Sequence, residues 1–188
     1  MRELALHVLD IAENSISAGA DEIKIRIEED LSGDILQIMI EDNGKGMDQE
    51  TLARVTDPFV TSRTTRKVGL GIPFFKAAAE ACDGRLTIHS FPGQGTTIDV
   101  IFKHSHIDRM PLGDIVSTLQ TLIIGTPDIH WIFEYQFNGS GFIFDDKPIK
   151  EAIEGVPLSE PAVMKFIREM LESGIQEARE NGIVKAIP

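Results

Sequence analysis

The spacing of apolar residues changes along the chain, and each change marks a new predicted element. Over residues 2–18 the apolar positions recur at helical spacing, which predicts an amphipathic helix. Residues 22–28 alternate strictly between polar and apolar, and residues 35–42 begin with an apolar run, so both stretches are predicted to be strands. The turn residues 30–34 lie between them, which indicates an antiparallel pair.

The next part of the chain follows a similar plan. Helices are predicted over residues 48–55 and 72–82, and Gly84 ends the second one. Strands are predicted over residues 85–90 and 96–102, with a turn between them. A helix, two strands, a loop with a helix and two more strands indicate an α/β (α+β) two-layer sandwich. In such a sandwich helices cover one face of the sheet.

The character of the sequence changes after Lys103. The sequence predicts a helix over residues 112–124 and a hairpin over residues 129–144 that turns at Asn138-Gly139. It predicts a last amphipathic helix over residues 160–180. We therefore expect two units. The first covers residues 1–103, and the second, residues 104–188, is a small α/β C-terminal extension that packs on the first unit or on a partner.

Charge and cysteine content narrow the function classes. The formal net charge of −12 argues against a general nucleic-acid-binding surface. Cys82 is the only cysteine among 188 residues, which excludes an internal disulfide and fits a reducing compartment. No apolar run approaches the ~20 residues that cross a bilayer. We expect a cytoplasmic protein without a membrane or nucleic-acid partner.

The first predicted helix carries a narrow polar stripe. Steps of three and four residues bring its members to one face: Glu3, His7, Asp10, Asn14 and Ser17. The stripe could be a solvated outer face. However, Asn is a poor helix former, and Lys or Glu would suit a solvated face better. The composition therefore favours a face that meets a polar ligand.

The second predicted strand ends in Asp42, followed by the turn Asn43-Gly44-Lys45-Gly46-Met47. A buried carboxylate at a strand end is costly unless a group donates hydrogen bonds to it. The exocyclic amine of adenine is such a donor, and a glycine-lined slot lets the flat ring approach the backbone. A tight turn without a ligand is the alternative for this stretch taken alone.

A basic loop precedes the helix predicted over residues 72–82. It contains Arg63, Arg66 and Lys67 and leads into Gly69-Leu70-Gly71. A glycine-rich entry to a helix presents free backbone N–H groups and the positive end of the helix dipole, which suits a phosphate. The neighbouring cations point to the same ligand.

These features, in this order and together with Gly93-Gln94-Gly95-Thr96-Thr97, resemble the GHKL ATPases over residues 4–102. That superfamily includes gyrase, the heat-shock chaperone, histidine kinases and the mismatch-repair protein MutL. The resemblance implies the Bergerat ATP-binding fold, with a mixed, mostly antiparallel sheet, and it implies ATP and Mg²⁺ as cofactors. The chain is most similar to small stand-alone ATP-binding proteins of the histidine-kinase type.

The resemblance also implies roles for individual residues. Asp42 would accept from the adenine amine, with Thr96 or Thr97 helping through a water, and Asn14 would be the magnesium ligand. The adenine slot would be lined by Gly44, Gly46 and Met47. The phosphates would meet Gly69, Leu70 and Gly71, and the lid over residues 59–68 would add Thr61 and Lys67.

Asp10 occupies the position where hydrolytic members of the superfamily carry a glutamate general base. Glu13 is a reserve candidate for that role. His7 is followed by Val8 rather than an acid, so it is not predicted to be a phosphorylation site.

Three functions remain open. The leading hypothesis is an ATP–magnesium-binding signalling protein that acts on a protein partner as a kinase or ATPase, with an anti-sigma-type serine kinase as one version. The second is a non-catalytic ATP sensor. The third, a pure interaction module, is disfavoured by the intact glycine and aspartate motifs. A homodimer is compatible with each of them.

Overall fold

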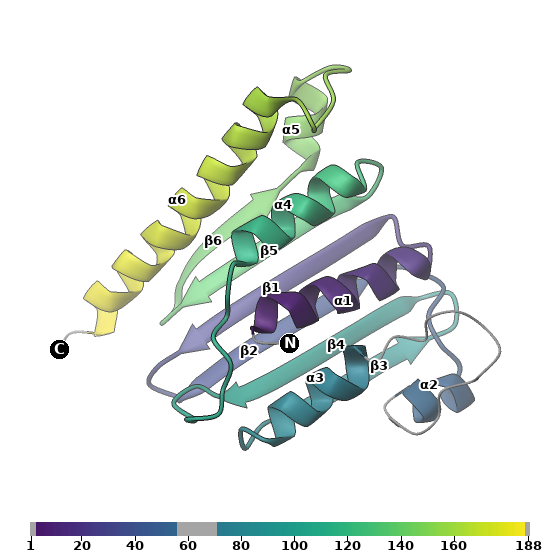
Figure 1. Ribbon diagram of the computed structural model, residues 1–188, viewed down its shortest axis with the longest axis vertical. Helices are drawn as coiled ribbons and strands as arrows, with labels where there is room; N and C mark the ends of the chain where they lie inside the picture. The colour runs from purple at the N-terminus through teal and green to yellow at the C-terminus, as the bar shows by residue number, and fades with distance from the viewer. Residues whose placement is uncertain (1–2, 56–70, 187–188) are drawn as a thin grey trace.

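The computed structural model describes residues 3–55 and 71–186, with side chains as far as residue 184. The elements in the described ranges are shown in Figure 1 and run in this order: α1 (Leu4–Ser17), β1 (Glu22–Asp30), β2 (Ile35–Asp42), α2 (Gln49–Val55), α3 (Gly71–Glu80), β3 (Arg85–Phe91), β4 (Gly95–Lys103), α4 (Ile115–Gly125), β5 (His130–Phe137), β6 (Ser140–Asp145), α5 (Lys147–Ala152) and α6 (Pro161–Ala186).

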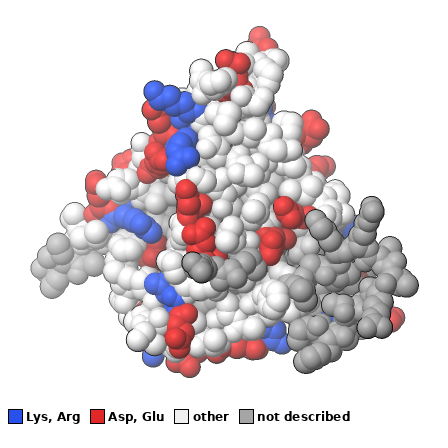
Figure 2. Space-filling model, viewed as in Figure 1, with Lys and Arg blue, Asp and Glu red and all other residues white. Residues whose placement is uncertain are grey.

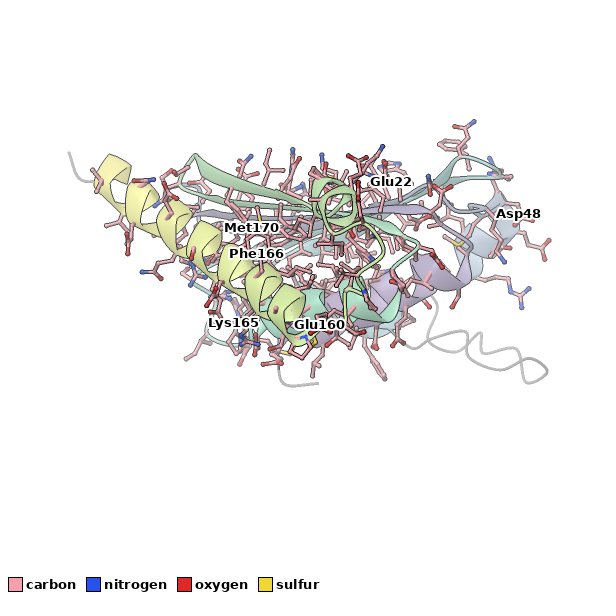
Figure 3. The ribbon with its side chains drawn as sticks, turned by 90° about the horizontal axis from the view of Figure 1, so that it is seen from above. Glu22, Asp48, Glu160, Lys165, Phe166 and Met170 are labelled. Carbon is pink, nitrogen blue, oxygen red and sulfur yellow. The ribbon has the colours of Figure 1, made fainter. Side chains whose placement is uncertain are left out.

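Six strands form one sheet in the order β3-β4-β2-β1-β5-β6. β1 and β5 are parallel, and the other neighbouring pairs are antiparallel. Figure 3 views the sheet nearly edge-on, with α1, α4 and α6 on the same side. The predicted two-layer fold with a mixed, mostly antiparallel sheet is therefore confirmed. None of the described helices is long and apolar enough to cross a membrane.

The alternation in β1 explains the two faces of the sheet. Ile23, Ile25 and Ile27 point toward the helices and are fully buried. Between them, Lys24 and Arg26 lie on the other face, where both form ion pairs with Glu134, at 2.7 and 2.8 Å. One face therefore builds the core, and the other is partly open to solvent with charges paired across strands.

The segment before α4 has a different role from the one predicted. The helix was expected to start at Leu112, but it begins at Ile115, after Gly113 with a φ of +80°. The carbonyl of Leu112 instead accepts the Ala5 N–H of α1 at 2.8 Å. The left-handed backbone conformation of Gly113 prevents the helix from starting earlier. The Leu112 carbonyl therefore stays free to accept an N–H group in the first turn of α1, which has no partner within its own helix.

The C-terminal part of the chain continues the same sheet. β5 lies beside β1 in a parallel register, and the hairpin from β5 to β6 turns at Asn138-Gly139, both with positive φ as that turn requires. The last helix is longer than the predicted 160–180 and packs on β5 and β6. At Gly174 an added Cβ would overlap the ring of Phe142, so the helix approaches the sheet closely there.

A buried polar network ties this part to β1. The carboxylate of Glu29 accepts from the Tyr135 hydroxyl at 2.6 Å and from the Arg179 guanidinium at 2.9 Å. The His104 ring lies 3.0 Å from the second carboxylate oxygen. Burial opposes ionisation of Glu29, but the hydrogen bonds from Tyr135, His104 and Arg179 hold its pKa below the ordinary value.

Candidate nucleotide site

The carboxylate of Asp42 forms the polar floor of the site. It is 9 % exposed at the end of β2. The Ser15 hydroxyl of α1 donates to its Oδ2 at 2.6 Å, and the Gly44 N–H donates to its Oδ1 at 3.0 Å. These two donors offset much of the cost of burying a charge, and they fix the plane of the carboxylate.

Two glycines allow the backbone to pack tightly around Asp42. Gly46 has a φ of +65°, and an added Cβ there would overlap the Phe91 carbonyl. Gly95 has a φ of +97°, and a Cβ there would overlap the Asp42 carbonyl. The turn after β2 therefore lies directly against the turn between β3 and β4, with no room for a side chain at either position.

Ser90 of β3 forms hydrogen bonds that hold the turn after β2 in place. Its hydroxyl accepts the Met47 N–H at 2.8 Å and donates to the Gly95 carbonyl at 3.0 Å. The Thr96 hydroxyl is 2.9 Å from it as well. The glycine-rich turn is thus held by hydrogen bonds to β3 and β4, which preorganises it for a flat ligand.

A cavity of about 250 Å³ opens above Asp42, between α1, α2 and the sheet. Its lining combines Asp42 and Thr96 with apolar side chains from four elements: Ile11, Val55, Ile72 and Ile98. Its volume lies just below the ~300–1,000 Å³ typical of small-molecule sites. Apolar walls around one carboxylate suit a flat aromatic base that carries a hydrogen-bond donor.

Asn14 connects this cavity with the polar stripe of α1. It lines the cavity beside Ser15, and among the described residues none hydrogen-bonds to its side-chain amide. Asp10 lies one turn earlier on the same face, partly buried. An amide oxygen suits Mg²⁺, which uses few protein ligands and takes the rest from phosphates and water, so the residues present fit that ion.

The start of α3 meets Asp10. A Cβ added to Gly71, the first residue of α3, would lie 3.0 Å from the Asp10 Cβ and 3.4 Å from its Oδ2. Burial raises the pKa of Asp10 above its ordinary value. A carboxylate with a raised pKa therefore lies beside the N-terminal end of a helix, where phosphate groups bind readily.

His7 stacks on Phe75 one turn below this contact. The ring centroids are 4.9 Å apart and the planes differ by 7°. The side chain is 3 % exposed, its Nδ1 has no hydrogen-bond partner in the described part of the chain, and burial lowers its pKa to about 4. His7 is therefore neutral and packs α1 against α3 rather than facing a ligand.

The structure places some predicted residues at the site and others away from it. Asn14, Asp42, Gly46, Met47 and Thr96 line the cavity. Gly44 lies behind Asp42 as its backbone donor, and Glu13 is exposed outside the lining. Thr97 pairs with Glu41 and so lies on the opposite face of the sheet from Thr96. The lid and its residues Thr61, Lys67, Gly69 and Leu70 lie outside the described residues.

Ser15, Ser90 and Gly95 contribute to the site but were not predicted from the sequence. Ser15 could have been predicted from the sequence, because it follows Asn14 directly and falls between the polar stripe and the apolar face of the helix. Ser90 gave no signal, since a serine in a strand beside a turn is common. Gly95 belongs to a recognised motif, but only the close approach of Asp42 shows why glycine is needed there.

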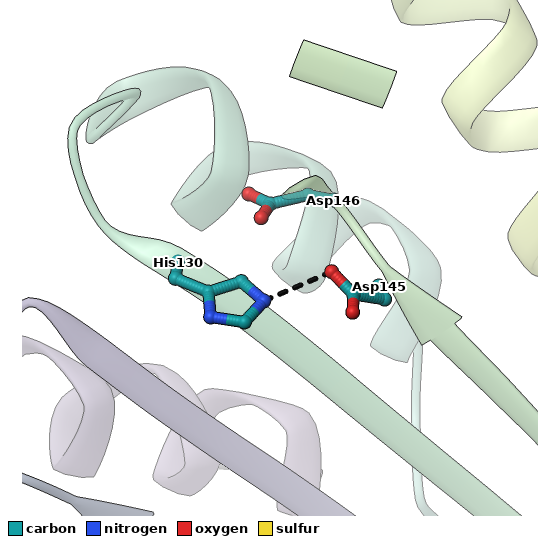
Figure 4. Close-up of side chains that lie close together, drawn as sticks. All are labelled: His130, Asp145 and Asp146. Carbon is teal, nitrogen blue, oxygen red and sulfur yellow. Dashed lines mark hydrogen bonds and ion pairs between the residues drawn. The ribbon is translucent and has the colours of Figure 1, made fainter. Parts of the chain in front are cut away.

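A second polar cluster lies at the start of β5, at the same end of the sheet as Asp42. His130, Asp145 and Asp146 have ligand atoms within 4.8 Å of one another (Figure 4). The His130 ring is already placed between Asp145, at 2.9 Å, and Glu22, at 3.0 Å. Lys150 lies 2.7 Å from Asp146. The Trp131 N–H donates to Asp146 Oδ1 at 3.0 Å, whereas Asp146 Oδ2 has the Lys150 ion pair but no hydrogen bond in the described part of the chain.

The surface charge agrees with the overall acidity. On the face shown in Figure 2, the described Lys and Arg side chains are scattered among acidic and neutral ones rather than gathered into one basic patch. The exposed ion pairs on helices follow the same mixed pattern, as in Lys165–Glu169 and Arg168–Glu172 of α6.

Comparison with known proteins locates the site in a recognised family. Residues 2–106 match the family described as histidine kinase-, DNA gyrase B- and HSP90-like ATPase, which is more than half of the chain. Sensor protein kinase FleS of Pseudomonas aeruginosa is 42 % identical over 94 residues, half of this chain and 23 % of that protein. Signal transduction histidine-protein kinase AtoS of Escherichia coli is 36 % identical over 102 residues, 53 % of this chain and 17 % of that protein.

A further relative is the non-motile and phage-resistance protein of Caulobacter vibrioides, 32 % identical over 119 residues, which are 58 % of this chain and 14 % of that protein. The chain thus spans less than a quarter of the length of each of these relatives. Among solved structures, the N-terminal domain of a DNA repair protein has the same fold. It gives a TM-score of 0.55 at 15 % identity over 93 % of this chain and 57 % of that one.

Proposed function

Because the chain belongs to the histidine kinase-, DNA gyrase B- and HSP90-like ATPases, it contains an ATP-binding domain, and we propose that it transfers the γ-phosphoryl group of ATP in a signalling reaction with a protein partner. One observation carries the proposal: the Asp10 carboxylate lies beside Gly71 at the start of α3, one helical turn from Asn14. An acid, an amide and a helix start therefore meet at the edge of the cavity that takes the base.

Each part has a role in that reaction. Asp42 holds the adenine amine, and the backbone N–H groups at the start of α3 hold phosphate oxygens. Asn14 would hold a magnesium ion, which neutralises charge on the phosphates when bound. Phosphoryl transfer depends mainly on such positioning and charge stabilisation.

Asp10 would act as the general base. It takes the proton of the attacking hydroxyl group or water, the attacking oxygen forms a bond to the γ-phosphorus, and the bond to the β-phosphate oxygen breaks to release ADP. The raised pKa of Asp10 suits this role, because a base works best when its pKa approaches the working pH.

Single-turnover assays with ATP labelled in the γ-phosphate, alone and with cell extract, test the proposal. Asp10→Asn should lower turnover by roughly 10²-fold or more, the usual scale for a general base, while ATP binding changes little. Glu13→Gln is the matched comparison, since Glu13 is exposed on the same helix. Turnover that survives Asp10→Asn and is lost in Glu13→Gln would assign the base to Glu13 instead.

The second candidate is a nucleotide sensor that binds ATP without turning it over. The observation in its favour is that Asp10 is one methylene shorter than the glutamate of the hydrolytic enzymes that the chain resembles. Binding of ATP by the wild-type protein with no turnover, alone or with any fraction of the extract, would support the sensor and contradict the kinase or ATPase.

A further inference from the structure

The hairpin of β5 and β6 returns two aspartates to the histidine with which β5 begins. Asp145 pairs with Ile132 near the start of β5, and the Trp131 N–H donates to Asp146 Oδ1 at 3.0 Å. In this way His130, Asp145 and Asp146 each place one ligand atom within 4.8 Å of the other two (Figure 4). The roles proposed above for the nucleotide site use none of these residues.

Glu22 of β1 fixes the orientation of the His130 ring. Its carboxylate lies 3.0 Å from Nδ1, so Nε2 is the nitrogen that faces the aspartates, at 2.9 Å from Asp145 Oδ1. A histidine that binds a metal through one nitrogen almost always donates its other N–H to a carboxylate, a carbonyl or water. Glu22 and His130 have this arrangement, with Nε2 on the side of the two aspartates.

The two aspartates are also held from behind. The Lys147 N–H donates to Asp145 Oδ1 at 2.9 Å, as the Trp131 N–H does to Asp146 Oδ1. Asp146 is fully buried, and in the described part of the chain its Oδ2 has an ion pair with Lys150 but no hydrogen bond. A buried carboxylate oxygen of this kind is stable only when a cation faces it.

The negative charge of the cluster exceeds the charge that Lys150 supplies. The carboxylates of Glu22, Asp145 and Asp146 surround one ring, and among the described lysines and arginines only Lys150 forms an ion pair with any of them. The Lys150 ammonium also donates to the Ile129 carbonyl, an acceptor that it can keep when it leaves Asp146. A divalent cation would therefore neutralise more of the charge than the ammonium does.

We propose that His130, Asp145 and Asp146 bind a divalent transition-metal ion such as Zn²⁺, with Glu22 orienting the histidine. One imidazole nitrogen beside carboxylate oxygens suits Zn²⁺ better than Mg²⁺ or Ca²⁺, which prefer oxygen ligands alone. Ligands about 2.0–2.2 Å from a tetrahedral zinc ion lie about 3.4 Å apart, so small side-chain rotations and one water complete the site. The ion ties the corner between β6 and α5 to the start of β5, and the proposal does not depend on ATP binding.

Calorimetry with ZnCl₂ on chelator-treated protein, without nucleotide, measures binding at this site. The wild type should bind one Zn²⁺ saturably, and His130→Gln should weaken binding at least tenfold because it removes the nitrogen ligand. His89→Gln is the matched control, the same substitution at an exposed position of β3, and it should bind Zn²⁺ as the wild type does.

Lys150→Met distinguishes a metal site from a network of ion pairs. The substitution removes the cation that competes for Asp146 and keeps most of the apolar stem. Without metal the variant should have a lower Tm than the wild type, since a buried carboxylate has lost its partner. It should bind Zn²⁺ several-fold more tightly than the wild type, and added Zn²⁺ should restore its Tm. A loss of Tm that Zn²⁺ does not restore would contradict the proposal.

Two further outcomes would overturn the proposal. The first is a wild-type protein without saturable Zn²⁺ binding. The second is equal affinity of His130→Gln and His89→Gln, which would place the metal at another site. If His130→Gln fails to fold, Asp145→Ala takes its place in the same comparison, because Asp145 is the less buried of the two aspartates.

Discussion

Arg179→Met tests whether the C-terminal helices and strands are one cooperative unit with the ATPase part. Arg179 donates to Glu29 of β1 at 2.9 Å and to the Tyr135 hydroxyl at 2.5 Å. The substitution removes both donors while leaving most of the apolar stem. Glu29, whose side chain is 11 % exposed, would keep its charge with fewer partners.

The size of the effect follows from burial. Hydrogen bonds to charged groups contribute about 1.5–3 kcal/mol each, and removing one partner of a buried ion pair costs about 3–5 kcal/mol. Because 43 % of the Arg179 side chain is exposed, water screens the pair, and we expect a loss of about 1–2 kcal/mol in unfolding free energy. That corresponds to a lower Tm by about 2–4 °C for each kcal/mol.

Urea unfolding at pH 7 measures this loss, followed both by far-UV circular dichroism and by the fluorescence of Trp131. Trp131 is the only tryptophan and lies buried in β5, so its signal reports on the C-terminal strands. Lys165→Met is the matched control, since Lys165 pairs with Glu169 at 3.6 Å with both side chains well exposed. The control should lie within about 0.5 kcal/mol of wild type.

Two results would refute this reasoning. Equal stabilities of Arg179→Met and Lys165→Met would mean that the buried network contributes nothing. Separate transitions for circular dichroism and fluorescence in the wild type would mean that the two parts of the sheet unfold independently.

Two further predictions concern the contact between α1 and α3. Unfolded His7 takes up a proton near pH 6.5 and folded His7 only near pH 4, so the unfolded state binds more protons in this window. Stability should therefore fall by roughly 3 kcal/mol as pH drops through it, and in His7→Phe, which can still stack on Phe75, urea titrations should show a flatter profile. Gly71→Ala should lower ATP turnover several-fold by pushing on Asp10, whereas Gly125→Ala, where a methyl meets nothing within 4 Å, should not.

The core elements could be predicted because their signals are local. Strict alternation in β1 and the Asn138-Gly139 turn each define a strand or hairpin without reference to the rest of the chain. The order of the motifs that resemble the GHKL ATPases also predicted that Asp42 and Asn14 would lie at one cavity. The start of α4 was mispredicted, because the apolar pattern extends to Leu112 while its carbonyl is used by α1, a contact more than a hundred residues away.

The remaining features depend on pairing between distant segments. Nothing in the local pattern of β5 specifies that it lies parallel to β1, which inserts the hairpin into the same sheet. The Glu29–Arg179 contact and the Ser15–Asp42 hydrogen bond likewise join segments that only the folded chain brings together. Serine and glutamate are common on helices and strands, so the residue type alone does not predict a hydrogen bond to a distant partner.

Calorimetric titration with ATP and magnesium tests the central claim most directly. The wild-type protein should bind one ATP saturably, and Asp42→Asn should weaken binding about 10- to 100-fold, the equivalent of one lost charge-assisted hydrogen bond. Asp99→Asn is the matched control, since Asp99 accepts from Gln37 at 2.6 Å on the opposite face of the sheet, and an amide oxygen can still accept that bond. Absence of saturable binding by the wild type, or an Asp42→Asn variant that binds as tightly as Asp99→Asn, would contradict the account.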